Sequence, residues 1–268
     1  MQWKNIYRGF FMGISDIVPG VSGGTIAVLL GIYDNLIAAI NGLFSKEWKR
    51  QFGFLIPLGV GAGLAIYTLS HLMEWLLKTY PIPTFFAFIG LIIGVLPFLL
   101  KESGAKTNFK LGHYLLLIVG VIALILLPEA QDTGEIISER TVGVYITLFI
   151  SGFLASAAMI LPGISGSFIL LILGVYYTVI NGLKELDISI ILIVGLGVLI
   201  GIMTMSKVIH YFLTHYRSAT FALIIGLVIG SVFVIFPGIP IGTSMWVMSG
   251  ITFTSGLLIA YLLGKVEY

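Results

Sequence analysis

The stretch PGVSGGTIAVLLGIY at residues 19–33 returns as PGISGSFILLILGVY at residues 162–176. One constant offset in residue number superposes Pro19 on Pro162 and Gly31 on Gly174. Proline lacks a backbone donor and glycine permits backbone angles that other residues avoid, so each Pro-Gly-x-Ser-Gly motif interrupts a continuous helix. Because apolar residues flank both motifs, the sequence predicts two broken helical hairpins in a chain with an internal repeat.

The repeat extends beyond the hairpins. A second, slightly shorter offset matches later glycines and polar residues, such as Gly90 with Gly226. The two offsets differ because the loop 46–52 of the first half has no full counterpart in the second. We therefore expect two homologous halves, residues 1–140 and 141–268. The first half is predicted to hold a hairpin at 5–42 and transmembrane helices at 53–77, 84–100 and 111–128, and the second a hairpin at 141–183 and helices at 188–213, 219–236 and 243–264.

The composition places most of the chain in lipid. Only 10% of the residues are charged and the mean hydropathy is +1.10, whereas soluble domains carry about 25% charged residues. Most of the apolar segments are also close to the length of about 20 residues that spans a bilayer as a helix. The composition and these lengths together predict an all-α polytopic membrane protein. The chain has no cysteine, and its four histidines lack metal-ligand spacing, so we expect no disulfide, metal or cofactor. No basic cluster suggests a nucleic-acid partner.

The loop charges predict the orientation. Lysine and arginine gather at the N-terminus and in the loops 43–52 and 101–110, whereas the loop 129–140 is acidic. Since positive loops stay in the cytoplasm, both ends of the hairpin 5–42 are expected inside, and three crossings then place the start of the second half outside. The halves are therefore predicted to be inverted repeats in the cytoplasmic (inner) membrane of a bacterium, with both termini cytoplasmic.

Broken helices at matching places in two halves are typical of transporter binding sites. Ser22 and Ser165 are placed to cap the helices that follow, so the N–H groups of residues 23–25 and 166–168 are expected to face the gap and attract a phosphate or carboxylate. The alternative interpretation is that both motifs are tight turns whose glycines allow close helix packing.

Two acidic residues lie close to the first motif. Asp16 stands within the first membrane segment, where a carboxylate is costly and therefore a candidate proton carrier or gate; alternatively, it accepts hydrogen bonds from the turn. Asp34 lies near the far end of the second leg of the hairpin. It is a candidate gating residue or, alternatively, a carboxylate that is solvated at the membrane interface. Their repeat partners are Met159 and Tyr177, so the role of either acid would be asymmetric.

Pairs of polar residues at spacing i, i+3 occur near the ends of two long helices. His71 and Glu74 correspond to Lys207 and His210 in the second half. They are candidate entry and exit contacts for an anionic headgroup, or side chains that reach from helix ends to the membrane surface.

One motif is enzyme-like. Residues 20–24 match the G-x-S-x-G string of serine hydrolases, but the strand that such a nucleophile requires is not predicted here. An intramembrane serine protease with Ser22 is a remote alternative, because the shorter string Gly-x-Ser-Gly, which such proteases use, occurs in both halves and the histidines lie near helix ends. We expect a transporter and no catalytic residue.

The stretches MGISDIVPGVSGGTIAVLLGIYDNLI at 12–37 and AMILPGISGSFILLILGVY at 158–176 closely resemble a bacterial and archaeal family of undecaprenyl-phosphate (polyprenyl-phosphate) translocases. The resemblance covers essentially the whole chain. It implies return of the lipid carrier from the outer to the cytoplasmic leaflet for reuse in peptidoglycan and other cell-wall polymers. The site residues carried over are Asp16, Pro19, Gly20, Ser22, Gly23, Gly24, Thr25, Pro162, Gly163, Ser165, Gly166 and Ser167.

The resulting hypothesis is alternating access. The two hairpins enclose a shared headgroup site, and rocking of one half against the other exposes it to each leaflet in turn. Proton coupling through Asp16 or His210 and a passive route both remain open, and a homo-oligomer is compatible with the sequence. The rival class is a carrier or channel for a small soluble anion, which predicts a water-lined vestibule in place of a lateral opening to lipid.

Overall fold

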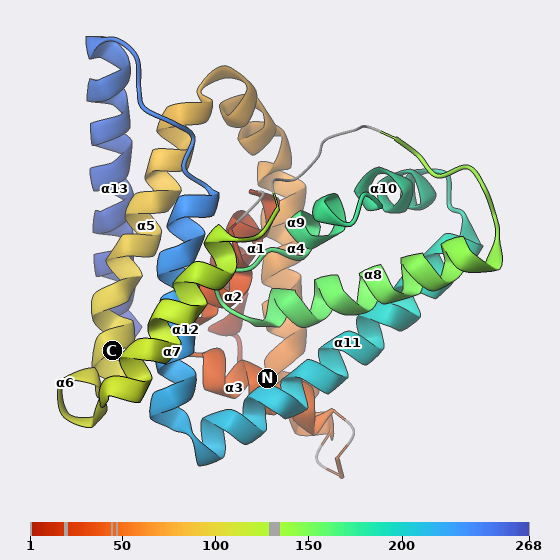
Figure 1. Cartoon of the computed structure of the whole chain (residues 1–268), viewed down its shortest axis with the longest axis horizontal. Helices are drawn as coiled ribbons and strands as arrows, with labels where there is room; N and C mark the ends of the chain where they lie inside the picture. Colours follow the sequence, from red (N-terminus) through yellow and green to blue (C-terminus); the bar gives the residue numbers. More distant parts are fainter. Residues whose placement is uncertain (1, 19–20, 44, 47, 129–134, 268) are drawn as a thin grey trace.

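The computed structural model describes residues 2–18, 21–43, 45–46, 48–128 and 135–267. These residues form helices joined by turns, without any strand (Figure 1). In chain order the helices are α1 (Asn5–Ile17), α2 (Gly23–Leu29), α3 (Tyr33–Gly42), α4 (Trp48–Thr79), α5 (Pro81–Glu102), α6 (Ala105–Asn108), α7 (Leu111–Ile125), α8 (Val142–Ile160), α9 (Gly166–Ile172), α10 (Tyr176–Lys184), α11 (Ile188–His215), α12 (Arg217–Val234) and α13 (Thr243–Glu267).

Six helices in the described part of the chain are long and apolar enough to cross a membrane: α4, α5, α8, α11, α12 and α13. The pairs α2–α3 and α9–α10 pass the same test together, although they bend by 120° and 115°. Helix α7 has 15 residues and is shorter than the predicted segment 111–128. It ends early because Pro128 follows, and the residue before a proline disfavours helical angles. The predicted all-α polytopic fold is confirmed.

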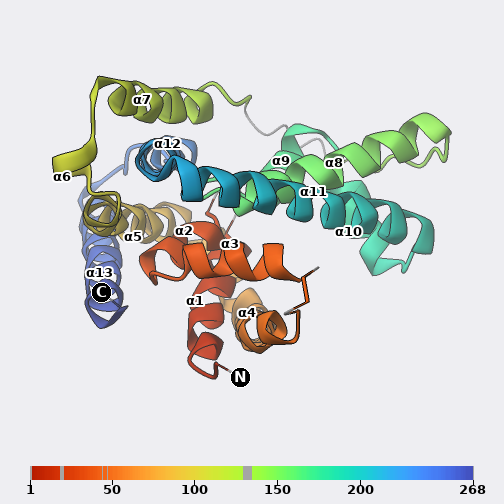
Figure 2. The same cartoon turned by 90° about the horizontal axis from the view of Figure 1, so that it is seen from below.

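The first helix of each half packs along the fourth. Gly9 of α1 meets Leu58 of α4, and Gly13 meets Ala62 one turn later, so the two helices run in the same direction. Helix α8 packs along α11 in the same way. Because α1 and α4 are parallel, the chain between them must return to the end at which α1 began, as a hairpin does (Figure 2).

The contacts of the two halves correspond residue by residue. The backbone of Ile6 lies against Gly61, and that of Phe149 lies against Gly197. Ile6 and Phe149 are related by the offset of the hairpins, and Gly61 and Gly197 by the shorter offset of the later helices. Glycine at both places lets the helices approach so closely that a Cβ atom would meet the facing carbonyl.

The last helix of each half packs on the other half. Helix α13 lies along α5, and α7 lies along α12 (Figures 1 and 2). Gly90 of α5 meets the carbonyl of Phe253, and Gly226 of α12 meets the carbonyl of Leu117 at the equivalent position. The segments 1–140 and 141–268 are therefore interlocked rather than separate bodies.

Each hairpin has a second break that the sequence reading missed. The second leg of each predicted hairpin, 5–42 and 141–183, is interrupted where Gly31 and Gly174 adopt left-handed angles, with φ of 62° and 68°. The N–H of Gly31 donates to Val28 and that of Ile32 donates to Ala27, at 3.0 and 2.9 Å. This is a Schellman motif, which ends a helix at a glycine. The matched glycines were the available signal.

The two hairpins differ in burial. Every residue of α2 is buried, and together with α5 and α12 it forms the centre of the main hydrophobic cluster. Helix α9, its counterpart, has no buried residue. Helix α3 also packs on α11, whereas among the described residues α10 makes no comparable contact with α4. The molecule is thus closed around the first hairpin and looser around the second.

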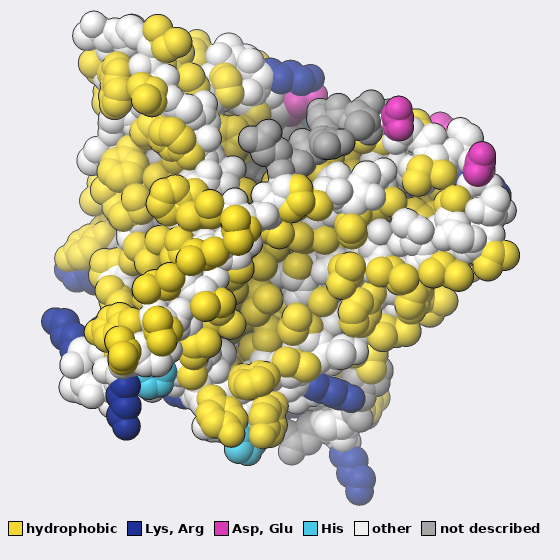
Figure 3. Space-filling model, viewed as in Figure 1, with side chains coloured by type: hydrophobic (Ala, Val, Ile, Leu, Met, Phe, Trp, Pro, Cys, Tyr) yellow, Lys and Arg dark blue, Asp and Glu magenta, His cyan; other side chains and the backbone are white. Residues whose placement is uncertain are grey.

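Charged side chains divide between the two ends of the molecule. Figure 3 shows lysine and arginine mainly along its lower edge and acidic side chains along its upper edge. The lower edge holds the start of α4, the end of α5 and the start of α12 (Figure 1). It is the end that the sequence predicts to face the cytoplasm.

We expect Gly226→Ala to destabilise the protein by about 1–3 kcal/mol, because the added methyl would push α7 away from α12. Unfolding by denaturant in detergent micelles measures this effect. The matched control is Gly250→Ala in α13, where a Cβ meets nothing within 4 Å. Equal stability of the two variants would contradict the close packing of α7 on α12.

Candidate functional site

The turn between α1 and α2 is held by its own side chains. The carboxylate Oδ1 of Asp16 accepts a hydrogen bond from the N–H of Gly23 at 2.8 Å. Ser22 caps α2, because its Oγ accepts from the N–H of Gly24 at 3.1 Å, and its carbonyl accepts from the N–H of Thr25 at 2.9 Å. The expectation that the N–H groups of residues 23–25 are free to hold an anion is therefore wrong: Asp16 and Ser22 already occupy them.

The second turn is built differently. Met159 stands where the first hairpin has Asp16, and Ser165 makes no capping bond to α9. Its hydroxyl instead pairs with that of Ser167 at 2.8 Å. Ser165 is buried, while Gly166 and Ser167 are half-buried. The second hairpin thus presents two hydroxyl groups without a neighbouring acid from its own first leg.

The tips of the two hairpins touch. The N–H of Gly163 donates to the hydroxyl of Thr25 at 2.9 Å, and the hydroxyl of Tyr33 donates to the carbonyl of Ile160 at 3.0 Å. Thr25 and Pro162 are buried at this contact. The structure therefore brings together the described motif residues from both halves. Pro19 and Gly20 lie outside the described residues.

Gly163 is fixed at the contact for two reasons. Its φ of 92° lies in the region that favours glycine, and a Cβ there would lie 2.7 Å from the carbonyl oxygen of Leu227 in α12. The second tip is consequently wedged between Thr25 and α12.

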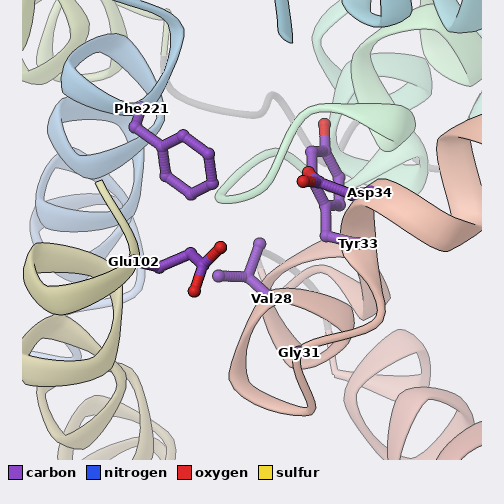
Figure 4. A pocket seen from close by; sticks show the side chains of 6 residues that line it. All are labelled: Val28, Gly31, Tyr33, Asp34, Glu102 and Phe221. Carbon is purple, nitrogen blue, oxygen red and sulfur yellow. The ribbon is translucent and has the colours of Figure 1, made fainter. Parts of the chain in front are cut away.

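Arg217, at the start of α12, joins three helices. Its Nη1 donates to Oδ2 of Asp34 in α3 at 2.6 Å, and its Nη2 donates to Oε1 of Glu102 at the end of α5 at 2.5 Å. Asp34 and Glu102 face each other across a small cavity of about 60 Å³, which Phe221 also lines (Figure 4). Asp34 therefore takes part in an ion-pair cluster, which the sequence reading could not find because the partners are far apart in the chain.

The four paired residues near helix ends lie elsewhere. His71, Glu74, Lys207 and His210 are all exposed, and Glu74 pairs with Lys78 at 2.6 Å on its own helix. Among the described residues, none of the four has a hydrogen bond to a hairpin tip. Their positions agree with side chains that reach towards the membrane surface.

Two apolar grooves occupy equivalent places at opposite ends of the molecule. One, of about 420 Å³, lies between α1, α4, α5 and α13 and includes Tyr80 and Thr84. The other, of about 430 Å³, lies beside α11 and α12 and includes Tyr216 and Thr220. These two pairs of residues are repeat equivalents of each other. The second groove also includes Leu161, next to the hairpin tip.

Among the described residues, no group of three or more acidic or histidine side chains is arranged to hold a metal ion. The broken helices meet in a polar contact at the hairpin tips. Apolar grooves lie beside these helices. Such a combination suits an anion with an apolar body.

Known proteins with similar sequences agree with this picture. A family model described as undecaprenyl phosphate translocase-like matches residues 12–253. A polyprenyl-phosphate transporter of Staphylococcus aureus is 48% identical over 275 residues, which cover 99% of this chain and 97% of the relative. A polyprenyl-phosphate transporter of Vibrio cholerae is 40% identical over 251 residues, covering 88% and 79%. No solved structure matches the chain.

We expect Thr25→Val to cost about 1–3 kcal/mol, because it leaves the buried N–H of Gly163 without an acceptor. Denaturant unfolding in micelles measures the loss, and Thr25→Ser, which keeps the hydroxyl, serves as the control. If valine and serine variants are equally stable, the bond between the hairpins contributes nothing to the fold.

Proposed function

Since the chain belongs to the undecaprenyl phosphate translocase-like family, we propose that it returns undecaprenyl phosphate from the outer to the cytoplasmic leaflet of a bacterial inner membrane. The protein is a multi-pass membrane transporter of a polyprenyl phosphate, not an enzyme. The returned carrier would re-enter the synthesis of peptidoglycan and other cell-wall polymers. The observation that carries the proposal is the contact of two broken hairpins beside apolar grooves.

The grooves favour a lipid over a soluble anion. A soluble anion needs a water-lined vestibule, whereas both grooves are lined mainly by apolar side chains. A phosphate at the hairpins with its isoprenoid tail in a groove would keep the tail away from water. We assign one groove to each leaflet, because they lie at opposite ends of the molecule.

The headgroup site is proposed at the hairpin tips, with unequal roles for the two. Asp16 already supplies an anion to the first tip, so a phosphate would meet repulsion there. Ser165 and Ser167 of the second tip offer hydroxyl donors at the start of α9, which is less buried than α2. Asp16 would then couple or gate transport, while the second tip would bind the headgroup.

We propose alternating access between inverted repeats. The parallel pairs α5–α13 and α7–α12 support the inversion. Helix α7 runs in the opposite direction to α5 (Figure 1), and α12, the repeat equivalent of α5, runs in the same direction as α7. The exchanged last helices change the original hypothesis, since a contiguous half cannot rock alone. The moving units would instead be the pairs α1–α4 and α8–α11 with their hairpins.

The remote protease alternative has a direct test. Among the described residues, neither Ser22 nor Ser165 has a histidine as a hydrogen-bond partner that could act as its base, so we expect no labelling of either serine by a serine-directed fluorophosphonate. Labelling would favour proteolysis.

Depletion of the protein in a strain without other such carriers should raise the amount of undecaprenyl phosphate at the outer surface, counted with a phosphate-binding probe. Wild type should reverse this, and Asp16→Asn should not. Asparagine keeps an acceptor for Gly23 but removes the charge, so the variant separates a role in transport from one in folding.

An unchanged outer-surface count on depletion would exclude the proposed return of the carrier from the outer leaflet. Full rescue by Asp16→Asn would show instead that Asp16 only holds the turn.

Filling a groove should slow transport without unfolding the protein. Ala219 lines the groove beside α11 and α12, and Ala219→Phe should lower the rate of polyprenyl-phosphate translocation in vesicles by about tenfold, the equivalent of about 1.4 kcal/mol. Leu199→Phe, on a lipid-exposed surface, is the control. Equal rates for both variants would show that the tail does not use this groove.

A further inference from the structure

The cluster of Arg217, Asp34 and Glu102 links helices at one end of the molecule. Its three members come from α12, α3 and α5, so the two ion pairs tie the first hairpin to helices of both halves. That end is the one where basic side chains gather (Figure 3). Figure 4 shows the two acids pointing towards each other from opposite walls of the cavity.

Among the described residues, the repeat-equivalent positions carry no such cluster. The repeat equivalents of Arg217, Asp34 and Glu102 are Pro81, Tyr177 and Gly238. The packing of the two hairpins differs as well. Helix α3 contacts α11, whereas among the described residues its equivalent α10 makes no comparable contact with α4. The repeat therefore does not impose these two ion pairs on both halves, and the Arg140–Asp187 pair near the other end joins different positions.

The guanidinium is shared between two separate carboxylates. Each acid takes one N–H group, whereas the stronger arrangement for arginine is a two-pronged bond to a single acceptor. Two carboxylates on one guanidinium also leave the cluster with a net negative charge. A phosphomonoester carries about 1.5 to 2 negative charges and three acceptor oxygens, so it can engage both N–H groups together.

One atom of the cluster is unsatisfied. Oδ1 of Asp34 is buried and has no hydrogen-bond partner among the described residues, an arrangement that is rare and costs free energy. The closed cluster is therefore not the best environment for Asp34, and its release from the cavity would restore hydration to this oxygen.

We infer that Arg217 binds the phosphate group of the substrate at this end of the path, and that Asp34 and Glu102 are resident anions which the phosphate displaces. The inference rests on the proposed function and assigns a second headgroup contact to it. The arriving phosphate takes the guanidinium and frees Asp34, so α3 can move and open this end. Return of the two carboxylates then expels the phosphate and closes the path.

Binding of farnesyl phosphate, a short prenyl monophosphate, to the purified full chain in nanodiscs tests the inference. Removing the resident anions with Asp34→Asn and Glu102→Gln together should tighten binding by about tenfold or more. Arg217→Gln should weaken binding by a similar factor, and Arg217→Lys, which keeps the charge without the fork, should lie between. Arg140→Gln, which breaks the pair with Asp187 near the other end, should leave binding unchanged.

Opening of the cavity gives a second measurement. The chain has no cysteine, so Val28→Cys introduces a single thiol at a cavity-lining position that is 2% exposed. Farnesyl phosphate should accelerate its reaction with maleimide in the background that retains Arg217. In Arg217→Gln the thiol should react fast with or without the ligand.

The outcomes separate the inference from the proposed function. If farnesyl phosphate binds wild type and Arg217→Gln equally, and the double acid variant binds no more tightly, the cluster only ties helices and the inference is overturned. If inorganic phosphate binds as well as farnesyl phosphate and shows the same dependence on Arg217, the phosphate contact stands and the lipid assignment falls.

Discussion

The structure depends on one constraint: within a membrane, no water is at hand to satisfy the backbone groups that a broken helix exposes. The hairpins meet this constraint with their own polar side chains. Asp16 and Ser22 take the first N–H groups of α2, and Thr25 takes that of Gly163 in the other half. Polar residues at the tips therefore hold the breaks in place first, and any substrate contact is added to that structural role.

The sequence was sufficient for most of the architecture. The apolar segments, the repeated motif and the loop charges predicted an all-helical polytopic chain, because lipid leaves helices as nearly the only solution for these segments. The breaks at Gly31 and Gly174 were missed, since an apolar run gives no sign of interruption unless its matched glycines are weighed. The exchange of α7 and α13 was also out of reach, because hydropathy does not say which apolar helix lies beside which.

The site divides in the same way. Motif residues could be found by their unusual sequence, and Thr25 meets Gly163 of the other half. The ion pairs of Arg217 could not, because they join residues separated by 183 and 115 positions. The prediction that the N–H groups of residues 23–25 are free was also wrong, because the sequence does not show that the carboxylate of Asp16 accepts a hydrogen bond from Gly23.

The exchanged helices also bear on how the protein is made. A ribosome delivers α5 well before α13, so the surface of α5 around Gly90 stays without its partner until the last helix leaves the ribosome. Helix α7 likewise waits for α12. Insertion of α5 into the bilayer must therefore precede its packing against α13. The packing of α5 consequently cannot be completed before α13 has been made, whereas α7 gains its partner earlier, with α12.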